Sequence, residues 1–283
     1  MTKAFCPGHI TCFFSPVLTD DVMTTGSIGA GIRLNKGTFV TVEERRDRKV
    51  SVVMDGKECD ARVTAAAISA MAPGKGFDVT AENELPVSQG MGMSAAGAIA
   101  AALCISSLTG TDEYDAYRAA HIAEVRNGGG LGDVAGIMGG RQPVRVKAGL
   151  PPFGKVIDSG IEMNTTIIVL GGKMYTKDIL SDAERIKKII VSGTGCVNEF
   201  VNSQTEKKLY EVSSRFSESA GLATKEVRAA LSKLRKDHEA SMCMLGNSVF
   251  TNADETSVKE ILGDDVQTIS CSSSGEGPKV IVR

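Results

Sequence analysis

Apolar and polar residues alternate over much of the first part of the chain, which is typical of half-buried strands. Runs rich in β-branched and aromatic residues at 38–42, 50–54 and 77–81 predict three strands. Between them, the alanine-rich residues 61–71 predict a short helix that ends at a Pro-Gly pair. We therefore expect this part of the chain to consist mainly of strands and short turns.

Helical patterns dominate the rest of the sequence, with Asp112 as a predicted N-cap. The predicted helices are 94–108, 112–126, 182–202, 206–220 and 224–245. Further strands are predicted at 144–146, 165–170, 266–271 and 279–282. Because strands and helices mix without a regular β-α-β alternation, we expect an α+β fold rather than a doubly wound parallel sheet.

A Pro-Pro-Phe-Gly sequence at 151–154 is the clearest candidate for a domain boundary, because these residues favour turns over regular structure. The chain has 283 residues, which is the length of about two domains at ~150 residues each. We therefore predict an N-terminal domain at 1–150 and a C-terminal domain at 151–283.

The composition is that of a globular protein, with 42% hydrophobic and 23% charged residues. A net charge of −2 and the absence of tryptophan argue against nucleic acid as a partner. The seven cysteines are scattered without a Cys-x-x-Cys pair, which is typical of neither a disulfide framework nor a zinc site. No segment is apolar and long enough to predict a membrane span or a signal peptide. We expect a cytoplasmic protein with no membrane partner.

A glycine-containing loop that leads into a helix is the most informative feature of the sequence. Gly90 and Gly92 permit a tight loop whose backbone N–H groups can face one point, and Ser94 opens an alanine-rich helix. The helix N-terminus adds its partial positive charge, so the loop predicts a site for an anion such as a nucleotide phosphate. The alternative is an ordinary loop in which Ser94 only caps a core helix.

Two carboxylates follow, separated by a run of glycines. In one continuous helix Glu124 and Asp133 would lie about 14 Å apart along the axis. The three consecutive glycines at 128–130 disfavour a helix, so we expect the chain to turn after Arg126 or Asn127 and to bring Asp133 back towards Glu124. One carboxylate could then hold Mg²⁺ and the other could accept a proton. Alternatively, Glu124 is a solvated helix residue and Asp133 a cap.

Three segments together resemble the GHMP small-molecule kinases. The central loop, Pro86-x-x-x-Gly90-Met91-Gly92-Met93-Ser94-Ala95-Ala96, is similar to the family's P-x-x-x-G-L-G-S-S-A phosphate loop. Here Met93 replaces the first serine, so Ser94 is the remaining hydroxyl. Pro7-Gly8-His9 is similar to the first family motif, with histidine where relatives often have a cation, and residues 273–280 are similar to the third.

The resemblance implies a fold, a cofactor set and roles for named residues. The implied fold has an N-terminal half like domain 2 of ribosomal protein S5 and a ferredoxin-like C-terminal half. The cofactors implied are ATP and Mg²⁺, with Ser94 and Glu124 as metal ligands and Asp133 as the catalytic base. The residues expected to bind the ATP phosphates are Gly90, Met91, Gly92, Met93, Ser94, Ala95 and Ala96.

Other segments resemble one branch of this family, the archaeal pantoate kinases, which phosphorylate a small hydroxy acid with ATP on the route to coenzyme A. These segments are residues 5–11, 26–32, 130–134 and 244–250. The substrate's carboxylate requires a donor, and the sequence leaves Arg126, Arg141 and Arg145 as alternatives. The residues expected to contact substrate are His9, Arg126, Gly275 and Gly277.

Other hypotheses remain open from sequence alone. The same fold could phosphorylate homoserine, mevalonate or shikimate, which differ in the acceptor but not in the mechanism. A non-catalytic ligand sensor could retain the fold after losing phosphoryl transfer, although the presence of Ser94, Glu124 and Asp133 argues against it. A homodimer is possible and no sequence feature tests it.

Overall fold

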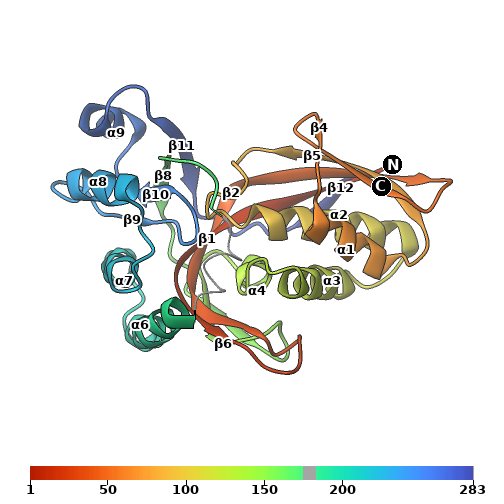
Figure 1. Cartoon of the computed structure of the whole chain (residues 1–283), viewed down its shortest axis with the longest axis horizontal. Coiled ribbons are helices and arrows are strands. Elements are labelled where there is room, and N and C mark those ends of the chain that lie inside the picture. Colours follow the sequence, from red (N-terminus) through yellow and green to blue (C-terminus); the bar gives the residue numbers. More distant parts are fainter. Residues whose placement is uncertain (175–182, 283) are drawn as a thin grey trace.

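The computed structural model describes residues 1–174 and 183–282. Within them the chain forms two sheets flanked by helices, as Figure 1 shows. The strands of the first sheet are β1 (Thr2–Val17), β2 (Gly26–Arg45), β3 (Val50–Met54), β4 (Lys57–Glu58), β5 (Gly76–Asn83), β6 (Pro143–Lys147), β7 (Lys155–Asp158) and β12 (Lys279–Val282). Those of the second are β8 (Asn164–Val169), β9 (Ala240–Met242), β10 (Ser248–Thr251) and β11 (Gln267–Ser272). This mixture confirms the predicted α+β class.

The first sheet is built around the long antiparallel hairpin of β1 and β2. The order β12-β1-β2-β5-β3-β4 is antiparallel except for the pair β3–β5, and β6 joins β2 further along the hairpin. Three helices, α1 (Arg62–Met71), α2 (Met93–Thr109) and α3 (Glu113–Arg126), lie along one face of this sheet (Figure 1). Nearly every residue of α2 from Met93 to Ser106 is buried, so this helix forms the centre of the first core.

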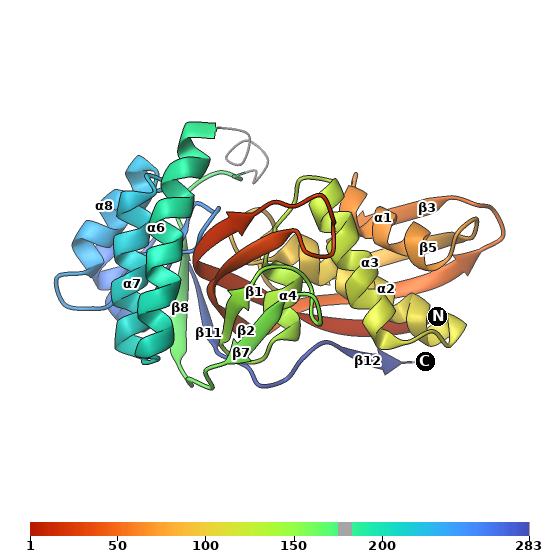
Figure 2. The same ribbon diagram turned by 90° about the horizontal axis from the view of Figure 1, so that it is seen from below.

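The second sheet has the order β11-β8-β10-β9. The helices α7 (Glu206–Ser219), α8 (Lys225–Leu234) and α9 (Glu255–Leu262) pack against its strands, whereas α6 (Ala183–Asn202) packs against α7 and the β1–β2 hairpin. Phe13 and Phe14 of β1 reach this half, where their rings lie 5.7 Å from those of Phe200 and Phe216 respectively. The short helix α4 (Asp133–Met138) lies beside α3 and the β1–β2 hairpin (Figure 2). The long hairpin therefore contributes to both cores.

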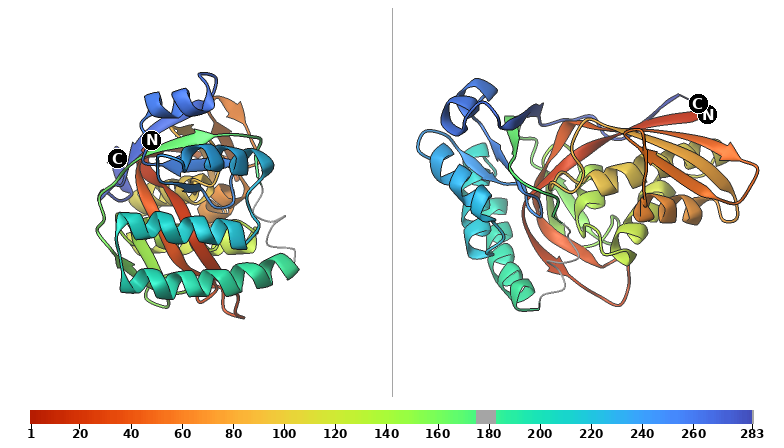
Figure 3. Two further views of the ribbon diagram at one scale, coloured as in Figure 1. Left: turned by 90° about the vertical axis from the view of Figure 1, so that its left-hand side faces the viewer. Right: turned by 45° about the horizontal axis from the view of Figure 1, so that its top comes forward.

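The last strand returns to the first sheet. β12 pairs with β1, so that the two ends of the chain lie side by side (Figure 3). β7 also belongs to the first sheet, through β6. The domain boundary at residue 150 stays a proposal. The strands β7 and β12 follow residue 150 in the sequence but belong to the first sheet.

Most predicted elements are present, and the differences have local reasons. The helix predicted at 224–245 was wrong beyond residue 234, because five consecutive polar residues, 235–239, interrupt the apolar pattern and lead into β9. Asp112 does cap α3, accepting a hydrogen bond from Tyr114 N, as predicted. The sequence pattern missed α4 and α9, which are short. The first residue of the helix predicted at 182–202, Asp182, lies outside the described residues. The helix α6 occupies the remaining residues, 183–202.

No helix in the described parts of the chain combines the length and apolar character needed to cross a membrane.

Candidate active site

The glycine loop ends at the N-terminus of α2. Gly90 and Gly92 both have positive φ angles, of 78° and 62°, which side chains rarely adopt. Gly92 is the N-cap of α2, and no side chain donates or accepts a capping hydrogen bond there. The first N–H groups of a helix lack partners within it. The first turn of this buried helix therefore presents its N–H groups to whatever lies beyond the loop.

Hydrogen bonds between Gln89 and the C-terminal half also hold the glycine loop in place. Its amide nitrogen donates to the carbonyl of Gly171 at 2.9 Å, and its side-chain oxygen accepts from Asn247 N at 3.2 Å. The Ser248 hydroxyl donates to the main-chain oxygen of Gln89 at 2.6 Å. No local sequence pattern predicts this role of Gln89, because its partners are 82 to 159 residues away.

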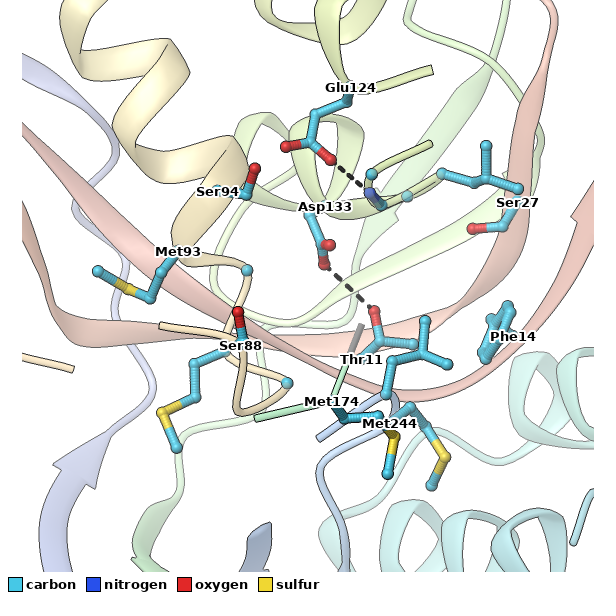
Figure 4. Close-up of a pocket in the computed structure, with 18 of the residues that line it drawn as sticks. Thr11, Phe14, Ser27, Ser88, Met93, Ser94, Glu124, Asp133, Met174 and Met244 are labelled. Atoms are coloured by element: carbon cyan, nitrogen blue, oxygen red, sulfur yellow. Dashed lines mark hydrogen bonds between the residues drawn. The ribbon is translucent and has the colours of Figure 1, made fainter. Parts of the chain in front are cut away.

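A cavity of about 410 Å³ lies against the loop. Its other walls are the segment 127–133, Thr11 and Phe14 of β1, and the turn at Met244 and Leu245. Figure 4 shows Ser94, Glu124 and Asp133 on one side of this cavity, and Met174 and Met244 across from them. The cavity therefore combines a polar end with an apolar wall contributed by the second half of the chain.

Glu124 is the buried carboxylate of the site, with 1% of its surface exposed. Gly130 N donates a short hydrogen bond to Oε2, whereas Oε1 is buried without a hydrogen-bond partner in the described structure. The Ser94 hydroxyl points towards it (Figure 4). The pKa of Glu124 is raised to about 7: burial raises it most, hydrogen bonding from Ser94 and from Gly130 N lowers it, and the charge of Asp133 raises it.

Asp133 begins α4 and faces the cavity with 21% of its side chain exposed. Its Oδ1 lies 2.8 Å from Nδ1 of His9 and 3.5 Å from the hydroxyl of Thr11. A Cβ atom at Gly92 would lie 3.4 Å from Asp133 Cγ, so the phosphate loop and this carboxylate pack directly together. The glycine at 92 is favoured by its φ angle and by the backbone oxygen of His9, which a Cβ atom would approach to 3.0 Å.

The turn between the two carboxylates forms as the glycine run predicts. α3 ends with Asn127 as its C-cap, and Gly129 N donates to the carbonyl of Glu124 at 2.9 Å. Gly129 and Gly130 pack so tightly against the carboxylates that a Cβ atom on either would collide with them. Glu124 and Asp133 consequently line one cavity although nine positions separate them.

Several residues expected to contact substrate lie away from the cavity. His9 is completely buried, Arg126 is exposed at the end of α3, and Gly275 and Gly277 are not among the described residues that line the cavity. The third motif instead contacts Arg33, whose guanidinium donates to the carbonyls of Ser274 and Gly275 and to that of Ile137 at the end of α4. The third motif is therefore linked to α4 through Arg33 and does not line the cavity.

The three candidate arginines have different surroundings. Arg141 pairs with Glu162 at a separate surface pocket, and Arg126 is exposed. Arg145 is 1% exposed, and none of its guanidinium nitrogens has a hydrogen-bond partner in the described structure. The guanidinium lies against Gly132, which lines the cavity, and its charge interacts with Asp133. Within the described residues it is therefore a buried guanidinium that no carboxylate contacts through a hydrogen bond.

Comparison with known proteins identifies the family. Residues 61–141 match the family described as the GHMP kinases N terminal domain. The chain is 32% identical over 279 residues to a pantoate kinase of Thermococcus kodakarensis, covering 93% of this chain and 92% of that protein. The chain belongs to the GHMP kinases. A pantoate kinase of Methanocaldococcus jannaschii is 29% identical, covering 95% of this GHMP kinase and 98% of the relative.

Solved structures support the same assignment. A protein titled a phosphotransferase related to the CoA biosynthesis pathway has a TM-score of 0.90 and 30% identity, covering 99% of this chain and 98% of that one. A homoserine kinase from Cytophaga hutchinsonii has a TM-score of 0.67 at 18% identity, covering 99% and 97%. The predicted GHMP kinase fold is therefore confirmed, and the chain is an ATP-dependent kinase.

Proposed function

We propose that this GHMP kinase transfers the γ-phosphoryl group of ATP to the 4-hydroxyl of (R)-pantoate, as a step of coenzyme A biosynthesis. Relatives named as pantoate kinases align over nearly the whole chain and support this acceptor. The observation that carries the proposal is the meeting of the uncapped N-terminus of α2, Glu124 and Asp133 in one cavity. Phosphoryl transfer requires these elements: a cradle for phosphate, a carboxylate beside it, and a proton acceptor.

The chain's own residues would act mainly by positioning and electrostatics. The N–H groups of residues 92–95 and the dipole of α2 would hold the phosphates. Asp133 would accept the proton of the attacking hydroxyl as the new O–P bond forms and the bond between the γ-phosphorus and the β–γ bridging oxygen breaks. The apolar wall with Met244 would exclude water, which competes with the acceptor for the phosphoryl group.

The donor set of the site fits Mg²⁺. The metal takes one or two carboxylates together with substrate phosphates, and Glu124 has a buried Oε1 with no assigned hydrogen bond among the described residues, on the side of the Ser94 hydroxyl. We therefore infer that Ser94 and Glu124 would hold Mg²⁺. When bound, the ion would neutralise charge on the phosphates.

Of the three arginines, Arg145 lies nearest the cavity, directly behind Gly132, so its charge would attract the substrate's carboxylate to that side of the cavity. Its guanidinium has no hydrogen-bond partner in the described structure, which leaves that charge uncompensated by a direct contact. Arg126 and Arg141 lack these features, because the first is exposed and the second is already paired.

The experiment that tests the function is ADP release with ATP, Mg²⁺ and a panel of (R)-pantoate, homoserine, mevalonate and shikimate. We expect turnover on pantoate alone. Turnover on a different acceptor would keep the mechanism and reject the proposed pathway. ATP binding without turnover on any acceptor would contradict the pantoate assignment and favour a sensor of the same fold.

The base is tested by Asp133→Asn. This variant keeps the shape of the side chain but cannot accept a proton, so kcat should fall by about 10²–10⁴-fold while nucleotide affinity is retained. A near-native kcat would show that Asp133 is not the base.

A further inference from the structure

His9 lies directly behind Asp133 and has no access to the cavity. Its side chain is 0% exposed, and its Nδ1 is 2.8 Å from Asp133 Oδ1. Its backbone N–H donates to the carbonyl of Met91 in the phosphate loop at 2.9 Å, which fixes the strand that carries it. His9 therefore contacts the proposed base and the glycine loop, but it does not line the cavity.

The opposite edge of the imidazole faces two glycines. Nε2 of His9 is buried without a hydrogen-bond partner in the described structure. A Cβ atom at Gly31 or at Gly136 would collide with this edge of the ring. The ring thus fills a slot in which Nδ1 faces a carboxylate and Nε2 faces Gly31 and Gly136.

This asymmetry fixes the position of the proton. A proton on Nε2 would leave a buried N–H donor without an acceptor, which is rare in proteins and costly. A proton on Nδ1 is donated to Asp133 Oδ1 and leaves only an unused lone pair on Nε2. A doubly protonated ring would again place an unpaired N–H between Gly31 and Gly136. The neutral ring with its proton on Nδ1 satisfies the contacts best.

The charged groups around the ring favour the same state. Burial lowers the pKa of His9 most strongly, the hydrogen bond to Asp133 raises it, and the guanidinium groups of Arg145 and Arg33 lower it. Two cations therefore flank the ring in addition to the one anion.

We propose that His9, as a neutral imidazole protonated on Nδ1, is a positioning residue that holds Oδ1 of Asp133 so that Oδ2 alone is left to accept the substrate's proton. This inference rests on the proposed role of Asp133 as base. Oδ2 lies on the side of Gly130, which lines the cavity, whereas Oδ1 is engaged by His9 and Thr11. A carboxylate fixed in this way presents one oxygen in one orientation, so less entropy is lost in orienting the base when the reaction occurs.

Two amide substitutions of His9 distinguish the roles of its two ring nitrogens. The amide nitrogen of asparagine takes the place of Nδ1, and that of glutamine takes the place of Nε2. We expect His9→Asn to keep kcat within a few fold and His9→Gln to lower it by about 10²-fold. The KM values for ATP and for the acceptor should change little in both, because His9 does not line the cavity. Equal losses in the two variants would overturn the proposal.

A double-mutant cycle tests whether His9 acts through Asp133. In the Asp133→Asn background, His9→Gln should cost almost nothing further, since the group that it positions is already lost. Additive losses would show a general structural role instead. If Asp133→Asn alone retained kcat, Asp133 would not be the base, and the positioning role of His9 would be rejected with it.

A measurement independent of activity is the ¹⁵N spectrum of the unmodified enzyme. The chain has three histidines, so the His9 signals are identified by their loss in His9→Asn. We expect a protonated Nδ1 and an unprotonated Nε2 at neutral pH. A proton on Nε2, or on both nitrogens, would overturn the inference even if every kinetic result agreed with it.

Discussion

The buried carboxylate of Glu124 shows how one residue can be costly for folding and suited to chemistry. Burial and the neighbouring Asp133 raise its pKa from 4.5 to about 7, so that near neutral pH the folded protein holds a proton that the unfolded chain has released. A cation at Oε1 would favour the ionised form. The site is therefore more stable protonated when empty and ionised when a metal is bound.

This predicts a dependence of stability on pH in the absence of nucleotide and metal. Because the folded-state pKa is the higher one, the free energy of unfolding should fall by roughly 3 kcal/mol as pH rises from about 4.5 to above 7. Glu124→Gln should remove this fall and be the more stable protein at pH 8. Thermal melts at several pH values measure it, with Glu260→Gln on the exposed part of α9 as the control. Parallel pH curves for wild type and Glu124→Gln would contradict the prediction.

Arg145 gives a second prediction at this scale. Arg145→Met keeps an unbranched apolar chain but removes the cation, so the KM for pantoate should rise about 10–100-fold while that for ATP changes little. Arg126→Met, which alters an exposed arginine, is the matched control and should leave both KM values near native. Steady-state kinetics with each substrate varied in turn distinguish the two, and an unchanged pantoate KM in Arg145→Met would reject the assignment.

The sequence predicted some of these residues and missed others for a physical reason. Ser94, Glu124 and Asp133 were found because glycines next to them control the local path of the chain. The contact between His9 and Asp133 spans 124 positions, and no local pattern encodes it. The roles of these residues in catalysis stay predictions.

At the scale of elements, α4 shows that a glycine within a helix can be required by its neighbour. Alanine is normally better than glycine in a helix by about 1 kcal/mol. In α4, however, a Cβ atom at Gly136 would lie only 2.5 Å from Nε2 of His9. In α2, the nearest atom to a Cβ at Gly97 is the Thr64 hydroxyl at 3.5 Å, an ordinary contact.

The two glycine-to-alanine substitutions should therefore have opposite effects. Gly136→Ala should lower both the melting temperature and kcat, because it displaces the imidazole or the whole of α4. Gly97→Ala, the control, should leave kcat unchanged and the melting temperature equal or higher. Melting curves and kinetics of both variants test this, and a stabilised, fully active Gly136→Ala would contradict the contact.

Elements were predictable from sequence to the extent that their own periodicity defines them. α2, α3 and β5 were predicted to within a few residues because their apolar patterns are complete. α4 was missed because six residues are too few to show a helical period, and its position depends on Arg33 and on its packing against the hairpin.

At the scale of the whole molecule, β12 joins the end of the sequence to its beginning. Its residues pair with Lys3, Ala4 and Phe5 of β1, and Val280 packs partly buried against the first core. The sequence predicted the strand but could not predict its partner, because pairing across the length of the chain leaves no local trace.

Removing residues 279–283 should destabilise the first half. We expect the free energy of unfolding to fall by about 1–3 kcal/mol, from the lost burial and strand pairing, with a matching decrease in melting temperature. Val282→Thr, at a side chain that is 42% exposed, is the control and should change little. A truncated protein that melted at the native temperature would show that this pairing contributes nothing to stability.

The contacts of Gln89 have a consequence for turnover. The phosphate loop continues directly into α2 of the first half, and Gln89 bonds it to Gly171, Asn247 and Ser248 of the second. A rotation of one half against the other would pull on both ends of the loop and change the cradle itself. With the proposed phosphate binding at this loop, release of the spent nucleotide would be mechanically coupled to the relative motion of the halves, and opening rather than bond making would then limit the rate.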